Sequence, residues 1–389
     1  MYTANLVFGN GIFWIIILLT IIGTISIQFI SKQFSFLELC IQIGAVCLIF
    51  YISFFITIRN VTGIMDKEIL SGYVTSATYE ESWTERVKHT YTTTHKVGKS
   101  SYTTTHTYYT NDYRSPKWYV NTTLGNMNID STEYNRLKTL FDNESKISDS
   151  HYNQVSIGDG KTYEVSYKGL QVSKVPKDLV YVTQQHDYEN LLKVSNSLFV
   201  VKSKSGKYNP IPYPYNTGYN CYTRVLNDAK LDNELIKQYN DLLNKYAGKY
   251  GRMKEMNPII YFTDKPQNFI WDLKYSWIMG KKNDIVMVIG VKNNKIDWCE
   301  IMCWTKKEIF KITLKSHIEL MDLKQVDTNI DIIATDINKL YLRMEMKEFN
   351  YLINDIAIPS KVYKIVLGLW VVLFIGLSIT FYKIDLRNK

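Results

Sequence analysis

Three uncharged apolar segments constrain what this chain can fold into more than any other feature. They cover residues 12–30, 39–58 and 365–382, and no Asp, Glu, Lys, Arg or His lies inside any of them. An α-helix that rises about 1.5 Å per residue needs roughly 20 apolar residues to cross a hydrocarbon core of about 30 Å. Each segment comes close to this length, so we expect three transmembrane helices.

The positions of these segments predict the layout of the chain. We expect a helical hairpin in residues 1–59, one large domain after it, and a C-terminal anchor with a basic tail in residues 361–389. Two passes return the chain to its starting side, so the N-terminus and the large domain share one side of the bilayer. The uncharged N-terminus favours the outside for that domain. Ion pathways usually need charged groups within the membrane, so uncharged spans indicate anchors, or a packing surface for another membrane protein, rather than a transporter.

The net charge of the chain bears on the classes of partner that it binds. The sequence has 46 Lys and Arg against 37 Asp and Glu, which gives a net charge of +9. Basic charge combined with aromatic residues is also typical of nucleic-acid-binding proteins. Here the lysines are scattered and the chain is anchored, so we expect no nucleic acid. The expected partners are the lipid bilayer and a protein of the same envelope.

The first part of the large domain has the composition of β-strands. Residues 60–180 are rich in Thr, Tyr, Val and Ser, which favour strands. Two runs, 87–97 and 101–110, flank a short turn with Gly98, and both contain Thr-Thr-Thr-His. They predict a hairpin within a β-rich subdomain. Residues 181–223 follow, and three prolines between positions 210 and 214 predict a Pro- and Tyr-rich linker there.

The second part, residues 224–360, alternates between helix and strand patterns. Apolar residues three and four apart predict a first helix that Asp228 caps and Gly248 ends, and a last helix from Asp327. Between them lie two predicted helices, one at residues 267–278 and one that starts at the capping-box sequence Thr305-Lys-Lys-Glu308. Three strands are also predicted there, at residues 257–263, 285–291 and 296–304. This order predicts an α/β sandwich, a small sheet flanked by helices.

Residues 224–352 resemble the TPM domain family. The resemblance rests on three phrases: Arg224–Ala229, the helix end Ser276-Trp277, and Gly280–Ile289. The family usually has Asp-Asn-Gly before the strand, where this chain has Asn283-Asp284-Ile285. Family members are typically anchored and extracytoplasmic; some are phosphatases and others are assembly or modulatory factors. The resemblance therefore implies a TPM-like domain with one of these two kinds of function.

The whole layout is also similar to uncharacterised membrane proteins of large tailed bacteriophages. That similarity implies the bacterial inner membrane, with the large domain in the periplasm. The five cysteines include no Cys-x-x-Cys pair, and they leave the compartment open.

The turn before the predicted central strand is a candidate cation or phosphate site. Lysines and a carboxylate at such a point could meet an anion, or a metal such as Ca²⁺ or Mg²⁺. The candidate residues are Lys281, Lys282, Asn283 and Asp284, with Asp264, Asp272 and Asp297 as possible partners. The alternative is a polar turn whose side chains satisfy local backbone groups.

The predicted hairpin carries a second candidate site. His89 and His95 are six residues apart and share one face of a strand, and His106 lies in the facing arm. Imidazole is a good ligand for zinc or copper. The alternative is a solvated strand face of Thr, Tyr and His.

Two functions are compatible with these features. The preferred one is a membrane-anchored protein whose extracytoplasmic domain binds or modulates another membrane or envelope protein, with no catalytic residue assigned. The alternative, which rests on the resemblance, is a membrane-tethered metal-dependent phosphatase-like hydrolase with Asp284 in its cation site.

Overall fold

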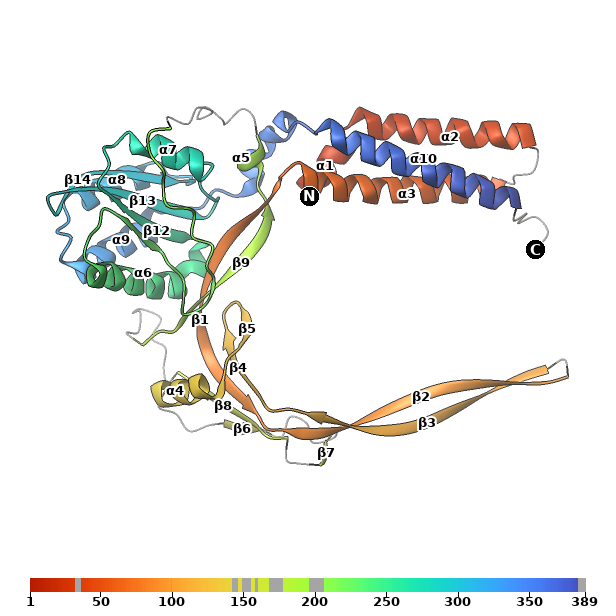
Figure 1. The fold of residues 1–389 in the computed structure, drawn as a ribbon, viewed down its shortest axis with the longest axis horizontal. Helices are drawn as coiled ribbons and strands as arrows, with labels where there is room; N and C mark the ends of the chain where they lie inside the picture. Colours follow the sequence, from red (N-terminus) through yellow and green to blue (C-terminus); the bar gives the residue numbers. More distant parts are fainter. Residues whose placement is uncertain are drawn as a thin grey trace.

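The computed structural model of this protein describes residues 1–31, 36–98, 100–141, 146–148, 155–157, 160–167, 178–195 and 206–383. The basic tail beyond residue 383 lies outside these ranges. Figure 1 shows a helical bundle, an α/β domain, and a curved β-structure that carries a long hairpin.

The bundle confirms the three predicted spans. It consists of α1 (Tyr2–Phe8), α2 (Gly11–Ser31), α3 (Phe36–Val61) and α10 (Ser360–Lys383), of which the last three are long and apolar enough to cross a membrane. The Trp370 indole donates to Thr20 Oγ1 at 2.9 Å, and Gln42 Nε2 donates to Ser378 Oγ at 2.8 Å. These bonds join α10 to the other two spans, as polar side chains commonly do between membrane helices.

The α/β domain is built on a four-stranded sheet. Its strands are β11 (Val225–Asp228), β12 (Asn257–Thr263), β13 (Asp284–Lys292) and β14 (Lys295–Cys303), in that spatial order. The first two pairings are parallel and the last, a hairpin, is antiparallel. Every residue of β12 is buried, as expected for a parallel strand covered on both faces.

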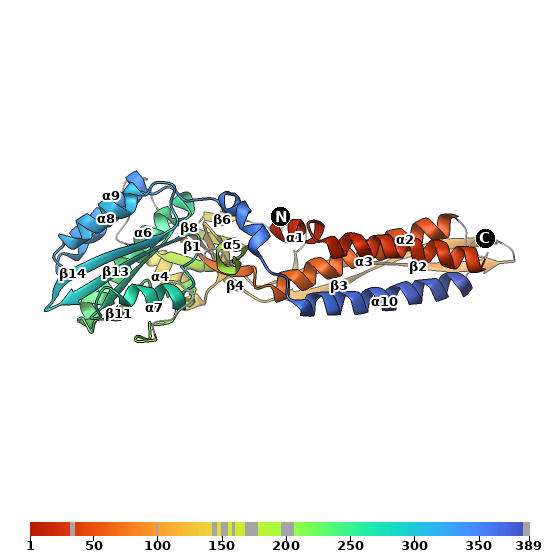
Figure 2. The ribbon, with the colours of Figure 1, turned by 90° about the horizontal axis from the view of Figure 1, so that it is seen from above.

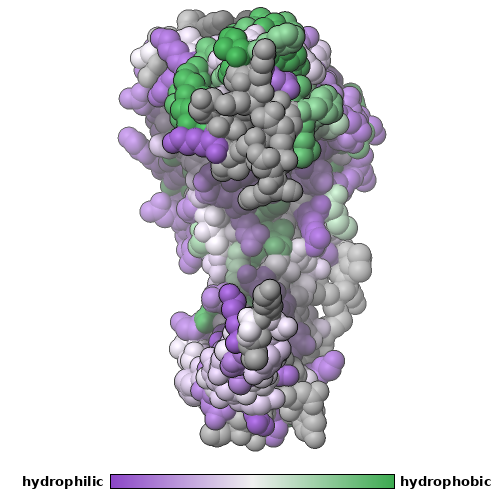
Figure 3. Space-filling view, turned by 90° about the vertical axis from the view of Figure 1, so that its right-hand side faces the viewer, coloured by the Kyte–Doolittle hydropathy of each residue, from purple (hydrophilic) through white to green (hydrophobic). Residues whose placement is uncertain are grey.

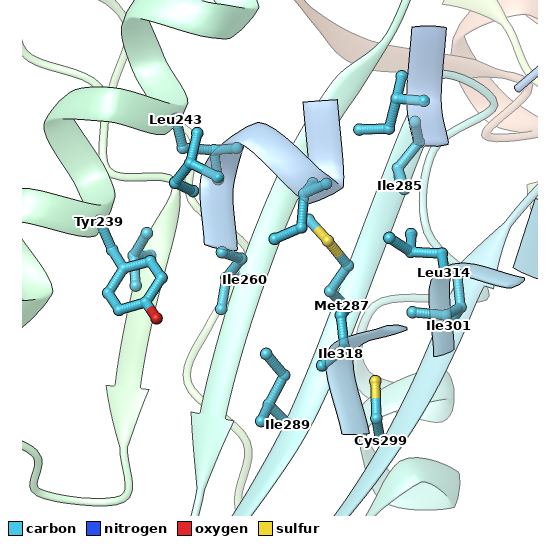
Figure 4. Close-up of a cluster of buried hydrophobic side chains, with 14 of the residues drawn as sticks. Tyr239, Leu243, Ile260, Ile285, Met287, Ile289, Cys299, Ile301, Leu314 and Ile318 are labelled. Carbon is cyan, nitrogen blue, oxygen red and sulfur yellow. The ribbon is translucent and has the colours of Figure 1, made fainter. Parts of the chain in front are cut away.

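Helices cover both faces of this sheet. On one face lie α6 (Asn233–Lys254), α8 (Ile309–Glu319) and α9 (Val326–Leu340), and on the other lies α7 (Phe269–Ser276). Figure 4 shows the first interface, where Tyr239 and Leu243 of α6 and Leu314 of α8 approach the strands. The mixed α/β class predicted from the sequence is therefore present.

Two predicted limits of the first helix were wrong. Asp228 ends β11, and the helix is capped instead by Asp232, whose carboxylate accepts from the backbone of Leu235 at 3.1 Å. Gly248 lies inside α6 and does not end it. A Cβ at Gly248 would lie 2.9 Å from the carbonyl oxygen of Gly72, so this glycine allows α6 to pack closely against the neighbouring strand.

That neighbouring strand, β1 (Met65–Glu80), connects the bundle to the rest of the molecule. Its first half pairs with β9 (Tyr181–Glu189), and its second half pairs with β4 (Lys117–Thr122) and β8 (Thr162–Ser166). The nine residues of β9 lie in the range predicted to be a linker, so the extended linker is confined to later residues. Smaller elements complete this part: β5 (Gly125–Asn128), α4 (Ser131–Phe141), β6 (Lys146–Ser148), α5 (Leu191–Val194), β10 (Gly218–Tyr219) and η1 (Met346–Asp355).

The predicted hairpin is present and is longer than expected. Its arms, β2 (Trp83–Val97) and β3 (Ser100–Arg114), stay in register over their whole length. At its base β2 also pairs with β7 (Val155–Ile157). Figures 1 and 2 show that the hairpin and the bundle project in the same direction from the body of the protein.

Candidate functional site

The turn singled out in the sequence is buried at the junction between the α/β domain and β1. Lys281 Nζ lies 2.7 and 2.8 Å from the two carboxylate oxygens of Asp66, near the start of β1. Asn190 Nδ2 donates to the same carboxylate at 2.9 Å, and Asn283 Nδ2 donates to the carbonyl of Ile69 at 2.8 Å. Burial alone would raise the pKa of Asp66, but the ion pair with Lys281 and the bonds from Asn190 and the backbone N–H of Lys67 hold it below its usual value. The turn therefore fastens two parts of the chain together.

Asp284, the first residue of β13, lies behind this ion pair. Its Oδ1 accepts from the Tyr213 hydroxyl and from Asn257 Nδ2, each at 2.8 Å, and its Oδ2 accepts from the backbone N–H of Lys281 at 2.7 Å. Burial raises the pKa of Asp284 from 3.8 to about 6, although these three bonds oppose the rise. Both oxygens of the Asp284 carboxylate therefore already accept hydrogen bonds from the protein.

A buried arginine extends the same network. Arg224 is fully buried, and it donates to Asn257 Oδ1 at 2.5 Å, to the carbonyl of Pro258 at 3.2 Å and to Ser71 Oγ. Asn257 thus bridges Arg224 and Asp284, the second buried pair of opposite charges at this junction. We call the set Asp66, Ser71, Tyr213, Arg224, Asn257, Lys281 and Asp284 the junction network.

The junction network does not offer free oxygen ligands to a cation. Asp66 pairs with Lys281, Asp284 is occupied by three donors, and the other predicted carboxylates lie elsewhere. Asp264 pairs with Lys265, Asp272 accepts from the backbone of Gly206 and Tyr208, and Asp297 is exposed on β14. Among the described residues, no group of three His, Cys, Asp or Glu side chains could hold a metal ion. The geometry therefore fits a structural role for this turn better than a Ca²⁺ or Mg²⁺ site.

Lys282 points to a different space, an open cavity of about 500 Å³ beside the junction. Glu68 lines it, with His186 Nδ1 at 3.1 Å from its Oε1 and Arg343 Nη2 at 3.0 Å from its Oε2. Burial, together with nearby Arg343, lowers the pKa of Lys282. Acidic and basic side chains both line this cavity, so its charge does not favour an anion or a cation.

The three histidines of the hairpin share one face, but the register places each opposite a tyrosine. His89 faces Tyr108, and its Nε2 lies 2.8 Å from Thr110 Oγ1. The pairs Tyr91–His106 and His95–Tyr102 are likewise stacked, with ring centroids 4.9 and 5.1 Å apart. The rings form an alternating ladder rather than a cluster of imidazoles, so the arrangement does not bring the predicted zinc ligands together.

Three comparisons with known proteins find no match for this chain. No family model, no curated protein and no solved structure matches it. The resemblance to the TPM domain family and the similarity to phage membrane proteins therefore stay predictions.

Most residues of the junction network have no signal in the sequence. Asp66 begins the charged run Asp66-Lys67-Glu68, and Ser71 and Asn257 are single polar residues beside apolar runs. Tyr213 sits between prolines in the predicted linker. An Asp that closely follows a transmembrane segment is ordinary in a sequence. Only its burial beside Lys281, a contact across 215 residues, identifies it as part of the site.

The raised pKa of Asp284 predicts a pH dependence that an Asp284→Asn variant should lack. Between about pH 4 and pH 6 the folded protein binds this proton more tightly than the unfolded chain, so stability falls as the pH rises through that window. A tenfold change in proton affinity is worth about 1.4 kcal/mol, so the loss is on the order of 2 to 3 kcal/mol. The variant in detergent should therefore gain roughly 5 °C in melting temperature over the natural protein between pH 4.5 and 6.5. If the difference in melting temperature between the variant and the natural protein is the same at pH 4.5 and at pH 6.5, the raised pKa of Asp284 is contradicted.

Proposed function

We propose that this chain is a membrane-anchored envelope protein whose large extracytoplasmic domain binds another membrane or envelope protein. The hairpin β2–β3 carries this proposal, because it projects from the body as a separate arm (Figure 1). Five of its tyrosines are more than half exposed: Tyr91, Tyr102, Tyr108, Tyr109 and Tyr113. Tyrosine offers a large contact area with few torsions to immobilise, and it is enriched at protein interfaces.

One face of the arm is already ordered for contact. We call it the aromatic face; its rings are His89, Tyr91, His95, Tyr102, His106 and Tyr108. Each histidine stacks on the tyrosine opposite, so the rings hold one another in place without a partner. Preorganised side chains lose less conformational entropy on binding, which favours affinity.

The rest of the molecule supports a binding role over transport. The charged residues of the three span helices lie only near the helix ends, so none marks an ion pathway: Glu38 and Arg59 in α3, and Lys361, Lys364 and Lys383 in α10. An extracytoplasmic TPM-like domain at the bacterial inner membrane, in a phage-encoded protein, is the setting that the resemblances imply. The metal-dependent phosphatase-like hydrolase rests on the resemblance alone.

Photo-crosslinking in native membranes tests the proposed interface. A benzophenone amino acid at Tyr91 or Tyr108 should give one discrete protein adduct. The same group at Leu320, an exposed residue at the C-terminal end of α8, should not. Buried aromatic contacts are commonly worth more than 1.4 kcal/mol, so the double variant Tyr91→Ala, Tyr108→Ala should retain the adduct protein at least about tenfold less well on purification. Equal adducts at Leu320, or full retention by the double variant, would refute the interface.

A further inference from the structure

The second face of the hairpin differs from the aromatic face in charge. In the observed register, Arg86, Lys88 and Lys96 of β2 share this face with threonines of both arms and with Tyr109 and Tyr113. We call it the basic face. The carboxylates of the hairpin, Glu85 and Asp112, lie on the aromatic face instead. The arm therefore has three cations and no acid on one side.

No cation of the basic face forms an ion pair with a described residue. Arg86 stacks over the ring of Tyr109, with its guanidinium carbon 4.4 Å from the ring centroid. The only described ion pair within the hairpin, between Arg114 and Glu85, lies on the aromatic face. The basic face is thus complementary to an external surface that carries negative charge.

The position of the arm identifies that surface. The hairpin runs alongside α2, α3 and α10 in nearly the same direction (Figures 1 and 2), so a bilayer around these spans would surround the arm if the arm kept this direction. Figure 3, which looks along this direction, shows hydrophobic colour over the upper part and pale to hydrophilic colour over the lower part, where the hairpin lies.

The hairpin cannot enter the hydrocarbon layer. Within the described residues β3 pairs only with β2, so the outer edge of the arm carries unpaired backbone N–H and C=O groups. Lipid satisfies neither these groups nor the charged side chains. An arm that meets the bilayer but does not enter it lies on the surface, among the headgroups.

The base of the arm allows this placement. Residues 81–82 and 115–116, which join the hairpin to β1 and β4, are outside the strands. Beyond these links, β7 pairs with β2 only at Thr84 and Glu85, next to the base. Glu81 in the first link is held by hydrogen bonds to Lys161 and Tyr163. A placement on the bilayer surface therefore requires the arm to turn beyond these bonds, while its internal pairing stays intact.

We propose that the basic face of the hairpin lies on anionic phosphate headgroups of the same bilayer that holds the three spans. The aromatic face then points away from the membrane, toward the space in which a protein partner is bound. The lipid contact does not require that partner, so a purified system tests it separately.

Fluorescence quenching in vesicles tests this placement with the full-length protein. A probe is attached at Thr92→Cys, on the basic face, or at Thr93→Cys, on the aromatic face, after the five native cysteines are replaced by alanine. The vesicles are phosphatidylcholine, with or without phosphatidylglycerol, and carry a nitroxide on the headgroup or deep in the acyl chain. With the anionic lipid, the headgroup nitroxide should quench the Thr92 probe at least about twofold more than the Thr93 probe. The deep nitroxide should quench neither.

Charge variants decide whether the basic face causes the contact. The triple variant Arg86→Gln, Lys88→Gln, Lys96→Gln should abolish the difference between the two probes, as should about 1 M salt, which shortens the screening length to about 3 Å. The matched control Lys230→Gln, Lys292→Gln, Lys295→Gln removes the same charge from exposed sites outside the hairpin and should keep the difference. Quenching by the deep nitroxide, or equal headgroup quenching of both probes in the presence of anionic lipid, would overturn the proposal. Melting temperatures of all variants exclude misfolding as the cause.

Discussion

Replacing Lys281 by methionine should lower the free energy of unfolding by about 3 to 5 kcal/mol, because the Asp66 carboxylate then stays buried without its counter-ion. Both residues are 6% exposed, and Lys281 contacts both oxygens of Asp66. Lys193 Nζ, 3.5 Å from Asp66 Oδ1, keeps part of the compensation, so we expect the lower end of the range. The melting temperature in detergent measures the effect.

Two further variants separate the ion pair from the loss of a lysine. Lys295→Met removes an exposed lysine of β14 and should change the melting temperature little. The double variant Lys281→Met, Asp66→Asn removes both charges and keeps an acceptor for Asn190, so it should recover more than half of the loss. Two results would contradict the buried-charge explanation. One is a loss of melting temperature in Lys281→Met as small as that in Lys295→Met, and the other is a double variant that melts no higher than Lys281→Met.

The spans and the hairpin could be predicted from short stretches of sequence, because neighbouring residues determine both. The apolar segments need no partner in the sequence to identify them, and Gly98 between two β-prone runs marks a turn directly. The structure places Gly98 at a φ of 64°, a backbone conformation that glycine adopts readily. The strands of the α/β domain were also recognisable, because runs such as Ile285–Val291 are apolar throughout.

The candidate sites depended on long-range contacts, and there the sequence was insufficient. The turn at residues 281–284 was recognised as unusual, but its role follows from Asp66 and Arg224, which approach it only in the folded chain. In the hairpin, composition predicted three nearby histidines. The register that sets each of them against a tyrosine depends on single-residue alignment of the arms, which composition does not determine. β9 was missed because the prolines that follow it dominated the reading of that range.

The buried Arg224 should be the most sensitive position of the junction network. Arg224→Met leaves the Asn257 and Pro258 oxygens without their donor, removes the link to Ser71 in β1, and takes a cation away from Asp284. We expect a loss of about 3 to 5 kcal/mol or more. Burial lowers the pKa of Arg224 to about 10, so the side chain is charged at neutral pH and its loss is an electrostatic change. Arg224→Lys should recover little, since one ammonium cannot reach acceptors that lie around a planar guanidinium.

The pH dependence of the stability loss in Arg224→Met distinguishes the contribution of the Arg224 charge from that of its hydrogen bonds. Without Arg224, the pKa of Asp284 should rise further above 6, because a favourable interaction of its charged form is removed. Arg224→Met should then melt at a lower temperature than the natural protein, and this deficit should be larger at pH 7.5 than at pH 5. At pH 5, Asp284 is largely protonated in both proteins. Arg252→Met, which removes an exposed arginine bonded to the carbonyl of Thr123, should show a small deficit at both pH values. A deficit of Arg224→Met that does not change with pH would mean that Arg224 acts through its hydrogen bonds alone, and would contradict the charge coupling to Asp284.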